Sequence, residues 1–490
     1  MLALAVLLVL TVLAGVTLAA GAKRHARRLQ RERRIHVDRF KLKRRHAEIE
    51  LEVFSSREVV DAITRYSREH GVTLEAATGK AREYLREIVP KFNLLAYYRF
   101  GAPIASAIMH FLYRPVVERR ILQEFNQRAA KGSSVVYVIN HRSNADYVLV
   151  AHMLFRFISL SYAVGEWARV WPLNHLFKWF GAYFIRRRYR EPLYHAVLGT
   201  FVGTITRKGV TQGIFIEGGL TRDGAFLQPK LGMLDYIVGA KRNPEFSAPL
   251  YLIPTAINYD RVLEDRNLTE ELLGREDRST RAEKLRTSFD FLFKNLGRSL
   301  LHRFKRYGYA VVTFGTPVLV DDFARSHPDL LAPTFEQRKP ALRELAELVM
   351  NEISGAVAVT PVSLAARVFD DHAQPLTDRE IADAMDRYRE RWTDRLWLLR
   401  EKNGMAIWQA ARPILELRHL IEPASRWRSD LFDGSGLPAI DEAWQWNPAE
   451  TRLRDYYANS LLTFAEVRAR GWPQPKSAAP VPALPVRDPA

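Results

Sequence analysis

The sequence lacks cysteine altogether, and this absence removes several kinds of chemistry at once. Without thiols there are no disulfides, no thiolate zinc sites and no cysteine nucleophile, which fits a reducing compartment. The signatures of dinucleotide enzymes, P-loop enzymes, serine hydrolases and zinc proteases (Gly-x-Gly-x-x-Gly, the P-loop, Gly-x-Ser-x-Gly, His-Glu-x-x-His) are also missing. The chemistry that remains belongs to histidine, carboxylates and arginine, and the sequence predicts neither a metal nor a cofactor.

Acidic residues are scarce near the N-terminus. Residues 1–45 hold twelve lysines and arginines against Glu32 and Asp38, so more than half of the net charge of +18 lies there. Residues 1–22 have no charged side chain, and about 20 apolar residues span a bilayer. We therefore expect a retained single-pass anchor in the cell (inner) membrane. A cleaved signal peptide is the alternative, although its positive charges normally come before its apolar run.

The basic flank sets the expected orientation of this anchor. Positive residues favour the cytoplasmic side of a membrane, so everything after residue 22 is expected to lie in the cytoplasm. The same residues attract anionic membrane lipids. Composition divides the chain into six predicted segments: the anchor (1–22), a basic juxtamembrane segment (23–50), a helical region (51–125), an α/β domain (126–358), a helical C-terminal region (359–470) and a disordered tail (471–490).

The pattern of apolar residues predicts an α/β fold with a mixed sheet flanked by helices and with helical N- and C-terminal regions. One predicted helix follows Ser56, with Val59, Val60, Ile63 and Tyr66 on one face, and ends at Gly71. Other predicted helices are 73–88, 193–208, 337–357 and 378–397, and a strand pair is predicted within 309–318. Residues 94–117 are apolar and aromatic but interrupted, which fits either an interfacial helix or a buried core helix.

The most informative stretch is a buried-strand pattern over residues 135–139, followed by a polar turn and an apolar helix. His141 is then expected at the tip of the strand and Asp146 in or near the first helical turn. From a loop, the imidazole can meet the carboxylate, which orients a histidine and makes it a better general base. On these residues alone, a loop histidine beside a capping aspartate is the simpler explanation.

Two further predicted strands end in polar loops. A short strand ends at Arg186 and Arg187, and guanidinium groups bind phosphate in a bidentate manner. Another strand, beginning at residue 213, ends in a glycine-rich loop that contains Glu217, Gly218, Gly219, Thr221, Arg222 and Lys230. For each loop considered alone, the simpler explanation is a run of solvated charges after the first strand and an ordinary glycine-rich turn after the second. Open α/β sheets, however, bind ligands at such strand ends, so the sequence predicts one shared cavity. Pro254 interrupts a further strand, 250–257, and predicts a sheet edge or a strand end.

Four blocks in this order resemble the glycerolipid acyltransferase superfamily. They are His141–Asp146 (His-x4-Asp), Gly181–Arg187, Phe215–Arg222, and Leu252–Pro254 with Asn258–Val262. The residues in these blocks are most similar to those of glycerol-3-phosphate acyltransferases of the bacterial membrane-bound type. The resemblance covers roughly residues 130–320. Thr221 stands where that branch usually has serine, and Asn144-Ala145 replaces a more common His-Met pair.

The resemblance implies transfer of a fatty acyl group from acyl-CoA or acyl-ACP to glycerol-3-phosphate, forming 1-acylglycerol-3-phosphate for phospholipid synthesis. It implies that His141 is the general base and that Asp146 holds its imidazole. Arg186 and Arg222, with Arg187 and Lys230, are implied to bind the acceptor phosphate. The remaining implied substrate-binding residues are Glu217, Gly218, Gly219, Thr221 and Pro254, with Pro254 on the acyl side.

Two other functions stay open on the sequence. A lysophosphatidate or other lysolipid acyltransferase shares the same motifs. A membrane-tethered protein that binds nucleic acid or anionic lipid would use the basic segment but leaves the four blocks unexplained; we expect membrane lipids as partners and no nucleic acid. The residues do not choose between acyl carriers, and they give neither the acyl length nor the oligomeric state.

Overall fold

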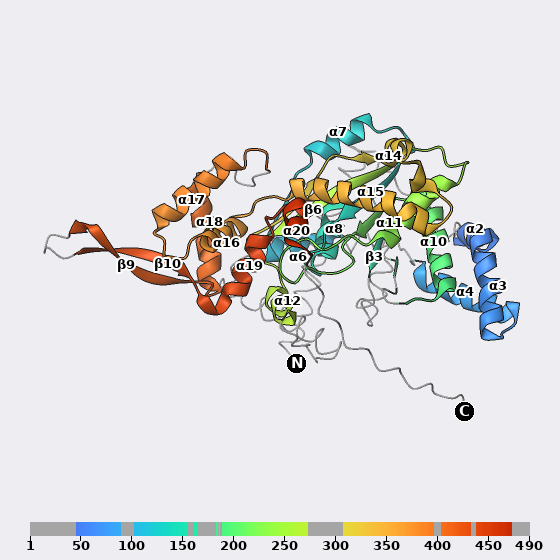
Figure 1. Cartoon of the computed structure of the whole chain (residues 1–490), viewed down its shortest axis with the longest axis horizontal. Coiled ribbons are helices and arrows are strands. Elements are labelled where there is room, and N and C mark those ends of the chain that lie inside the picture. Colours follow the sequence, from blue (N-terminus) through green and yellow to red (C-terminus); the bar gives the residue numbers. More distant parts are fainter. Residues whose placement is uncertain are drawn as a thin grey trace, which may run out of the picture.

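A mixed β-sheet forms the centre of the protein (Figure 1). The structure is a computed structural model, and it describes residues 46–89, 102–154, 161–164, 183–184, 186, 189–272, 307–395, 403–432 and 438–472. The strand order is β1-β7-β6-β2-β5-β3-β4, and β8 also pairs with β6. The strands are β1 Arg114–Val117, β2 Ser134–Ile139, β3 Ser161–Val164, β4 Tyr183–Phe184, β5 Gln212–Phe215, β6 Leu250–Tyr259, β7 Tyr309–Phe314 and β8 Val318–Leu319.

The direction of the strands changes at β6. From β6 through β2, β5 and β3 to β4, all neighbours run parallel, whereas β7 and β8 run antiparallel to β6. The sheet is therefore mixed, which confirms the prediction for the α/β part. Parallel strands that are buried on both faces need helices on both sides.

Each face of the sheet belongs to a different hydrophobic core. Val136 and Val138 of β2 point into one core, and Tyr137 and Ile139 point into the other, because side chains alternate along a strand. The first core is covered by α2 His46–Ser55, α3 Arg57–His70, α4 Leu74–Ile88, α10 Pro192–Arg207, α11 Leu231–Val238 and α15 Phe335–Ala356. The second is covered by α6 Ala102–Leu112, α8 Asp146–Leu154, α16 Pro361–Asp371, α17 Asp378–Arg391, α18 Gly404–Leu417 and α19 Thr451–Asn459.

Short elements complete the connections between these layers. They are α7 Arg120–Arg128, α12 Asp265–Glu271, α14 Val320–Ser326 and α20 Phe464–Arg470, with the 3-10 helices η5 Gly239–Arg242, η6 Pro328–Leu331 and η7 Pro448–Glu450. Local sequence signals fix several helix ends as predicted. Thr73 caps α4 by accepting a hydrogen bond from the amide of Ala76, and Gly71 ends α3 in the left-handed conformation at φ 63°. Thr377 begins α17 with a capping box, but this helix ends at Arg391 and not at residue 397.

Some predictions about local structure are wrong. Val60 was predicted on the same face of α3 as Val59 and Ile63, but it is 47% exposed, because the buried residues are Val59, Ala62 and Ile63. The region predicted as helical before residue 125 contains β1. The predicted pair at 309–318 exists as β7 and β8, but both pair with β6 and not with each other.

The C-terminal region is helical as predicted, but it also contains a long antiparallel hairpin. Its strands are β9 Ile421–Phe432 and β10 Pro438–Trp446, and they project away from the sheet (Figure 1). The hairpin forms a two-stranded sheet that is separate from the central sheet, and Trp444 of β10 also forms an isolated antiparallel bridge with Leu376. Ile421, Trp444 and Trp446 of this hairpin belong to the second core, but the charged residues between them did not indicate strands in the sequence.

Pro254 lies inside a central strand, so the prediction of an edge or a strand end is wrong. It stands opposite Val138 of β2, and its carbonyl accepts a hydrogen bond from the amide of Gly315 at 2.9 Å. The amide and carbonyl of one strand residue face the same side, so the missing N–H of Pro254 faces the Gly315 turn between β7 and β8. The ladder with β2 loses nothing, and β6 tolerates the proline.

Several predicted segments lie outside the described residues. They are the anchor and the basic segment up to residue 45, Arg187, the stretch 273–306 and the tail after residue 472. Among the helices that the structure describes, none combines the length and the apolar character needed to cross a bilayer.

Candidate active site

Two of the predicted polar loops meet at the carboxyl edge of the parallel strands. Ile139, the last residue of β2, is in register with Phe215, the last residue of β5. His141 and Glu217 each follow two residues later. The backbone amide of His141 donates a hydrogen bond to Glu217 Oε2 at 2.7 Å, and the amide of Leu227 donates to Oε1 at 2.7 Å. The predicted convergence of these two loops is therefore present.

The side chain of Asn140 explains how the chain leaves the sheet at this point. Its amide nitrogen donates to the carbonyl of Ile257 at 3.1 Å, and its amide oxygen accepts from the amide of Ile257 at 2.7 Å. The side chain thus satisfies both backbone groups of the neighbouring strand β6. The backbone of the next residues is free to turn, and His141 is presented at the end of β2.

His141 and Asp146 form the contact that the sequence predicts. The Nδ1 atom lies 2.9 Å from Asp146 Oδ2, and Asp146 is the first residue of α8. The same oxygen accepts the amides of Arg142 at 2.8 Å and Ser143 at 3.1 Å. The hydroxyl of Tyr259 donates to Oδ1 at 2.6 Å. Four donors therefore fix this fully buried carboxylate, and it in turn directs the Nδ1–H of the imidazole toward itself.

Aromatic rings fix the remaining orientation of the imidazole. The ring of Phe215 stacks on His141 with centroids 4.2 Å apart and an interplanar angle of 29°. Tyr147 packs edge-on at 5.4 Å and 84°. With Nδ1 committed to Asp146, the lone pair that can accept a proton is on Nε2. His141 is 1% exposed, so proton transfer at this nitrogen would take place away from bulk water.

Two glutamates flank this pair: Glu217 is buried and Glu264 is partly buried. Burial raises the pKa of Glu217 to about 7, and the Arg142 guanidinium and two backbone N–H groups oppose the shift. Burial also raises the pKa of Glu264 to about 7, opposed by the hydroxyl of Ser143, which donates to it at 2.7 Å. Both carboxyl groups can change charge near neutral pH, as is common at functional sites.

Three residues of this site were not assigned a role from the sequence: Arg142, Tyr259 and Glu264. The first two lie within the blocks that carry the family resemblance, so their positions were visible but their contacts were not. Glu264 follows the last block by two residues. Nothing in a linear sequence indicates that Tyr259 would reach Asp146 across 113 positions.

The predicted phosphate-binding arginines are not in contact with the imidazole. Arg186 follows β4, which is three strands from β2, so the two chain ends are about 14 Å apart along the sheet edge. Its guanidinium binds both oxygens of Glu87, at 3.0 and 2.6 Å, and lies over the ring of Tyr189 at 4.6 Å. Arg222 is 52% exposed on its side chain and pairs with Glu271 at 2.7 Å.

Contacts made by its own residues fix the conformation of the glycine-rich loop. Gly218 has φ 68°, and a Cβ there would approach Lys230 Cγ at 2.9 Å, so glycine is required on two grounds. The amide of Thr221 donates to the carbonyl of His141 at 3.4 Å, and its hydroxyl donates to Asp223 at 3.0 Å. Lys230 immediately precedes α11, and its side chain is exposed. Pro254 lies deeper, beside Val138 and not beside His141. The roles of these residues in substrate binding stay predictions.

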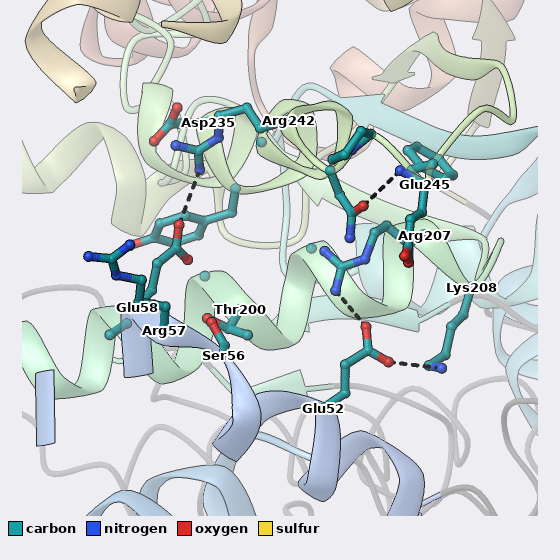
Figure 2. A pocket seen from close by; sticks show the side chains of 18 of the residues that line it. Glu52, Ser56, Arg57, Glu58, Thr200, Arg207, Lys208, Asp235, Arg242 and Glu245 are labelled. Atoms are coloured by element: carbon teal, nitrogen blue, oxygen red, sulfur yellow. Dashed lines mark hydrogen bonds and ion pairs between the residues drawn. The ribbon is translucent and has the colours of Figure 1, made fainter. Parts of the chain in front are cut away.

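A large cavity of about 1100 Å³ lies among α2, α3, α10 and η5 (Figure 2). These helices are on the side of the sheet that faces the first core. Several charged groups of the cavity are paired with one another. Glu52 contacts both Arg207 and Lys208 (Figure 2). The buried Arg338 binds Asp235 at 2.7 Å. His141 is not among its lining residues. Among the described residues, no three histidine, aspartate or glutamate side chains are grouped so that they could hold a metal ion.

Comparisons with known proteins match this chain to acyltransferases. The family model for acyltransferases matches residues 120–258, and the model for the glycerol-3-phosphate acyltransferase C-terminal region matches residues 292–464. The glycerol-3-phosphate acyltransferase of Aeromonas hydrophila is 30% identical over 331 residues, 64% of this chain and 38% of that protein. That of Pseudomonas fluorescens is 31% identical over 344 residues, 67% of this chain and 39% of that protein. The chain thus spans less than half the length of these relatives.

One crystal structure is similar at lower identity. It is the 1-acyl-sn-glycerophosphate acyltransferase of Thermotoga maritima, 14% identical, with a TM-score of 0.27. The match covers 68% of this chain and 93% of that chain.

Proposed function

The chain belongs to the glycerolipid acyltransferase superfamily, and on that premise we propose that it transfers an acyl group from a thioester to glycerol-3-phosphate. The observation that carries the proposal is the buried contact of 2.9 Å between His141 Nδ1 and Asp146 at the carboxyl edge of the sheet. The names of the relatives support the acceptor. The donor is an acyl thioester, either acyl-CoA or acyl-ACP.

The proposed reaction is a direct transfer without an acyl-enzyme. The acceptor hydroxyl attacks the thioester carbonyl while His141 Nε2 takes its proton. Collapse of the tetrahedral intermediate breaks the carbon–sulfur bond, and the imidazolium returns the proton to the leaving thiolate. Asp146 stabilises the transient imidazolium and keeps the ring oriented. A well-placed general base contributes about 10²–10⁴-fold to the rate.

The phosphate of the acceptor is proposed to bind the arginines at the same sheet edge. Arg222 is the more available cation, because about half of its side chain is exposed and its partner Glu271 is also at the surface. A surface ion pair of this kind is worth about 1 kcal/mol or less, so a phosphate can displace it. Arg186 already has a bidentate carboxylate partner in Glu87 and would have to exchange or share it. Arg187 and Lys230 are proposed as weaker contributors.

We also propose that residues 1–22 anchor the protein in the cell membrane, with the acyltransferase part on the cytoplasmic face. The apolar composition of this segment and the basic residues up to position 45 support this arrangement. A protein without residues 1–45 should move from the membrane fraction to the soluble fraction. Recovery of this shortened protein in membranes washed with high salt would contradict the anchor.

The decisive experiment for the activity measures thiol release with purified protein, an acyl thioester and a panel of acceptors. Glycerol-3-phosphate should be consumed, and lysophosphatidate and non-phosphorylated glycerol should serve poorly. His141→Ala should lower turnover at least 10²-fold. His372→Ala is the matched control, because its ring contacts the carbonyl of Val368 on its own helix. A folded His141→Ala protein that keeps more than about a tenth of the activity would contradict the role of the base.

A preference for lysophosphatidate over glycerol-3-phosphate would contradict the proposed acceptor but not the proposed acyl transfer. Absence of thiol release with every acceptor would remove the proposed function altogether.

A further inference from the structure

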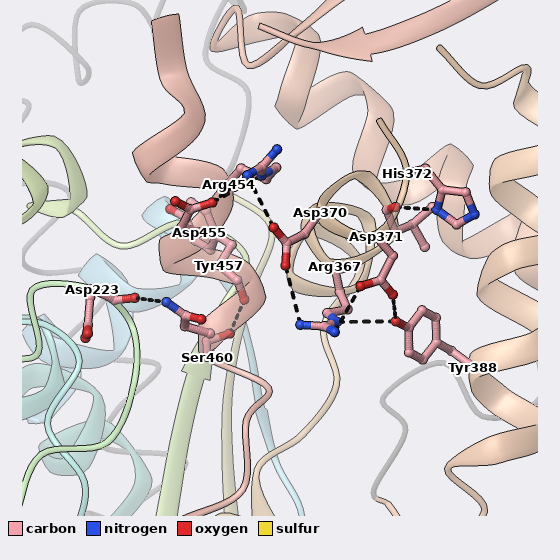
Figure 3. Close-up of polar contacts among 12 residues, drawn as sticks. Asp223, Arg367, Asp370, Asp371, His372, Tyr388, Arg454, Asp455, Tyr457 and Ser460 are labelled. Carbon is pink, nitrogen blue, oxygen red and sulfur yellow. Dashed lines mark hydrogen bonds and ion pairs between the residues drawn. The ribbon is translucent and has the colours of Figure 1, made fainter. Parts of the chain in front are cut away.

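The C-terminal region reaches directly into the loops that carry His141 and Glu217. The side-chain amide of Asn459, the last residue of α19, donates to the carbonyl of Asp223 at 3.0 Å (Figure 3). Next to it, Gly224 has φ 81°, and a Cβ there would lie 1.8 Å from the carbonyl oxygen of Tyr456. The backbone of α19 and the backbone of the glycine-rich loop are therefore in close contact, and only glycine permits it.

Arg142 connects these two segments with the histidine loop. Its Nη1 donates to the carbonyl of Gly224, and its Nη2 donates to the carbonyl of Ser460 at 3.5 Å. The guanidinium lies 5.0 Å from the ring centre of Phe226. The carbonyl of Arg142 accepts the hydroxyl of Tyr456 at 3.4 Å. At 2% exposed, Arg142 is a buried cation placed between the loop after β2, the loop after β5 and α19.

Helix α19 is itself held by the rest of the C-terminal region. Arg454 pairs with Asp370 of α16 at 3.3 Å, and Arg367 of α16 pairs with Asp371 at 2.9 Å (Figure 3). Tyr388 of α17 contacts both Arg367 and Asp371, which joins α17 to the same cluster (Figure 3). The place of Ser460 and Asn459 therefore depends on α16 and α17.

We propose that Arg142 is a positioning residue that locks the His141 loop and the Glu217 loop onto α19, so that the C-terminal region forms part of the active site. This inference rests on the proposed acyl transfer. Arg142 lies one residue after the base and touches neither the acyl group nor the phosphate in the proposed reaction. Its influence passes through the backbone of the glycine-rich loop and through the charge that it places near Glu217.

The charge matters because Glu217 is buried. The titratable or charged groups around it are His141 and Arg142 from the loop after β2, Asp146 at the start of α8, and Lys230, which lies beside Gly218 just before α11. Arg142 is the largest of the influences that keep the pKa of Glu217 down, and Asp146 acts in the opposite direction. The carboxylate of Glu217 accepts the amides of His141 and Leu227, and its ionised form is the better acceptor.

The test compares Arg142→Met, Arg142→Lys and Asn459→Ala with wild type in the full chain. Arg142→Met removes charge and hydrogen bonds, and it should lower kcat at least tenfold. It should also move the acidic limb of the activity profile upward by about one pH unit, because an opposite charge is lost next to a carboxylate. Arg142→Lys keeps the charge, so its acidic limb should stay in place. Arg412→Met is the matched control, because this arginine pairs with Asp378 and stacks on Trp444 within the C-terminal region.

Hydrogen–deuterium exchange gives a readout that is independent of activity. The backbone amides of residues 221–227 should exchange at least tenfold faster in Arg142→Met and, to a smaller extent, in Asn459→Ala. Unchanged exchange and an unchanged pH profile in folded Arg142→Met would overturn the proposal. If Arg142→Met does not fold, the exchange rates of Arg142→Lys and Asn459→Ala serve as the test. Wild-type exchange rates in both variants would overturn the proposal. If the wild-type protein shows no acyl transfer, the proposed function is refuted. The hydrogen–deuterium exchange rates would then still test whether Arg142 positions the two loops.

Discussion

Replacement of Asp146 by asparagine tests the geometry on which the mechanism depends. The carboxylate lies 2.9 Å from His141 Nδ1 and is fully buried, so its negative charge acts on the imidazole without screening by water. An amide of the same shape keeps an acceptor but loses the charge that stabilises the imidazolium. In a serine protease triad the same change lowers kcat about 10⁴-fold by favouring the wrong tautomer.

The expected loss is somewhat smaller in this protein, about 10³–10⁴-fold in kcat, or about 4–5 kcal/mol of transition-state stabilisation. The stacked ring of Phe215 continues to hold the imidazole when the carboxylate is gone. The assay is thiol release at saturating acceptor, with the melting temperature measured in parallel to establish folding.

Asp260→Asn is the matched control for this change. Asp260 is equally buried and accepts the amides of Tyr309 at 2.7 Å and Val362 at 3.0 Å, but it has no contact with His141. Its replacement should affect stability more than kcat. An Asp146→Asn protein that folds and turns over at more than a tenth of the wild-type rate would refute the role given to the carboxylate.

Three further predictions concern Tyr259, Arg222 and Glu264. Tyr259→Phe removes the 2.6 Å hydrogen bond to Asp146 Oδ1 and should cost about 1–3 kcal/mol of stability and roughly tenfold in kcat, with KM unchanged; a wild-type kcat would contradict it. Arg222→Ala should raise KM for glycerol-3-phosphate roughly tenfold, as expected for one charge-assisted contact, and an unchanged KM would remove Arg222 from the phosphate site. Burial raises the pKa of Glu264 from 4.5 to about 7, so its native form binds more protons than its unfolded form between these values. The free energy of unfolding should therefore fall by about 3 kcal/mol as the pH rises from about 4.5 to 7. Glu264→Gln should flatten the melting temperature across this range, and an unaltered slope would argue against the shift.

Asp146 and Glu217 also hold the loops of the site in place, so we expect substitutions of these two residues to affect folding as well as activity. Asp146 satisfies two backbone amides of its own loop, and Glu217 satisfies two more, so each carboxylate has a structural task besides its chemistry. Removing a buried acceptor leaves unsatisfied donors, which costs about 1–3 kcal/mol for each. Activity measurements on these positions therefore need a folding control.

The sequence by itself determined the elements whose cause is local. The β-branched run before Asn140 made β2, the capping residues Thr73 and Thr377 began their helices, and Gly71 ended α3. The proximity of His141 and Asp146 also followed from five residues of chain. These features depend on steric preferences and hydrogen bonds within a few residues, which a linear pattern records.

Only the tertiary structure decided the contacts between distant segments. It showed that Pro254 fits a central strand because its missing N–H faces a turn, and that Arg186 is held by Glu87 at a distance from the imidazole. It also brought Tyr259 to Asp146, and α19 to Arg142 across more than 300 residues. Such contacts depend on strand order and on helix packing across the sheet, and these arise from the burial of both faces together and not from any local sequence.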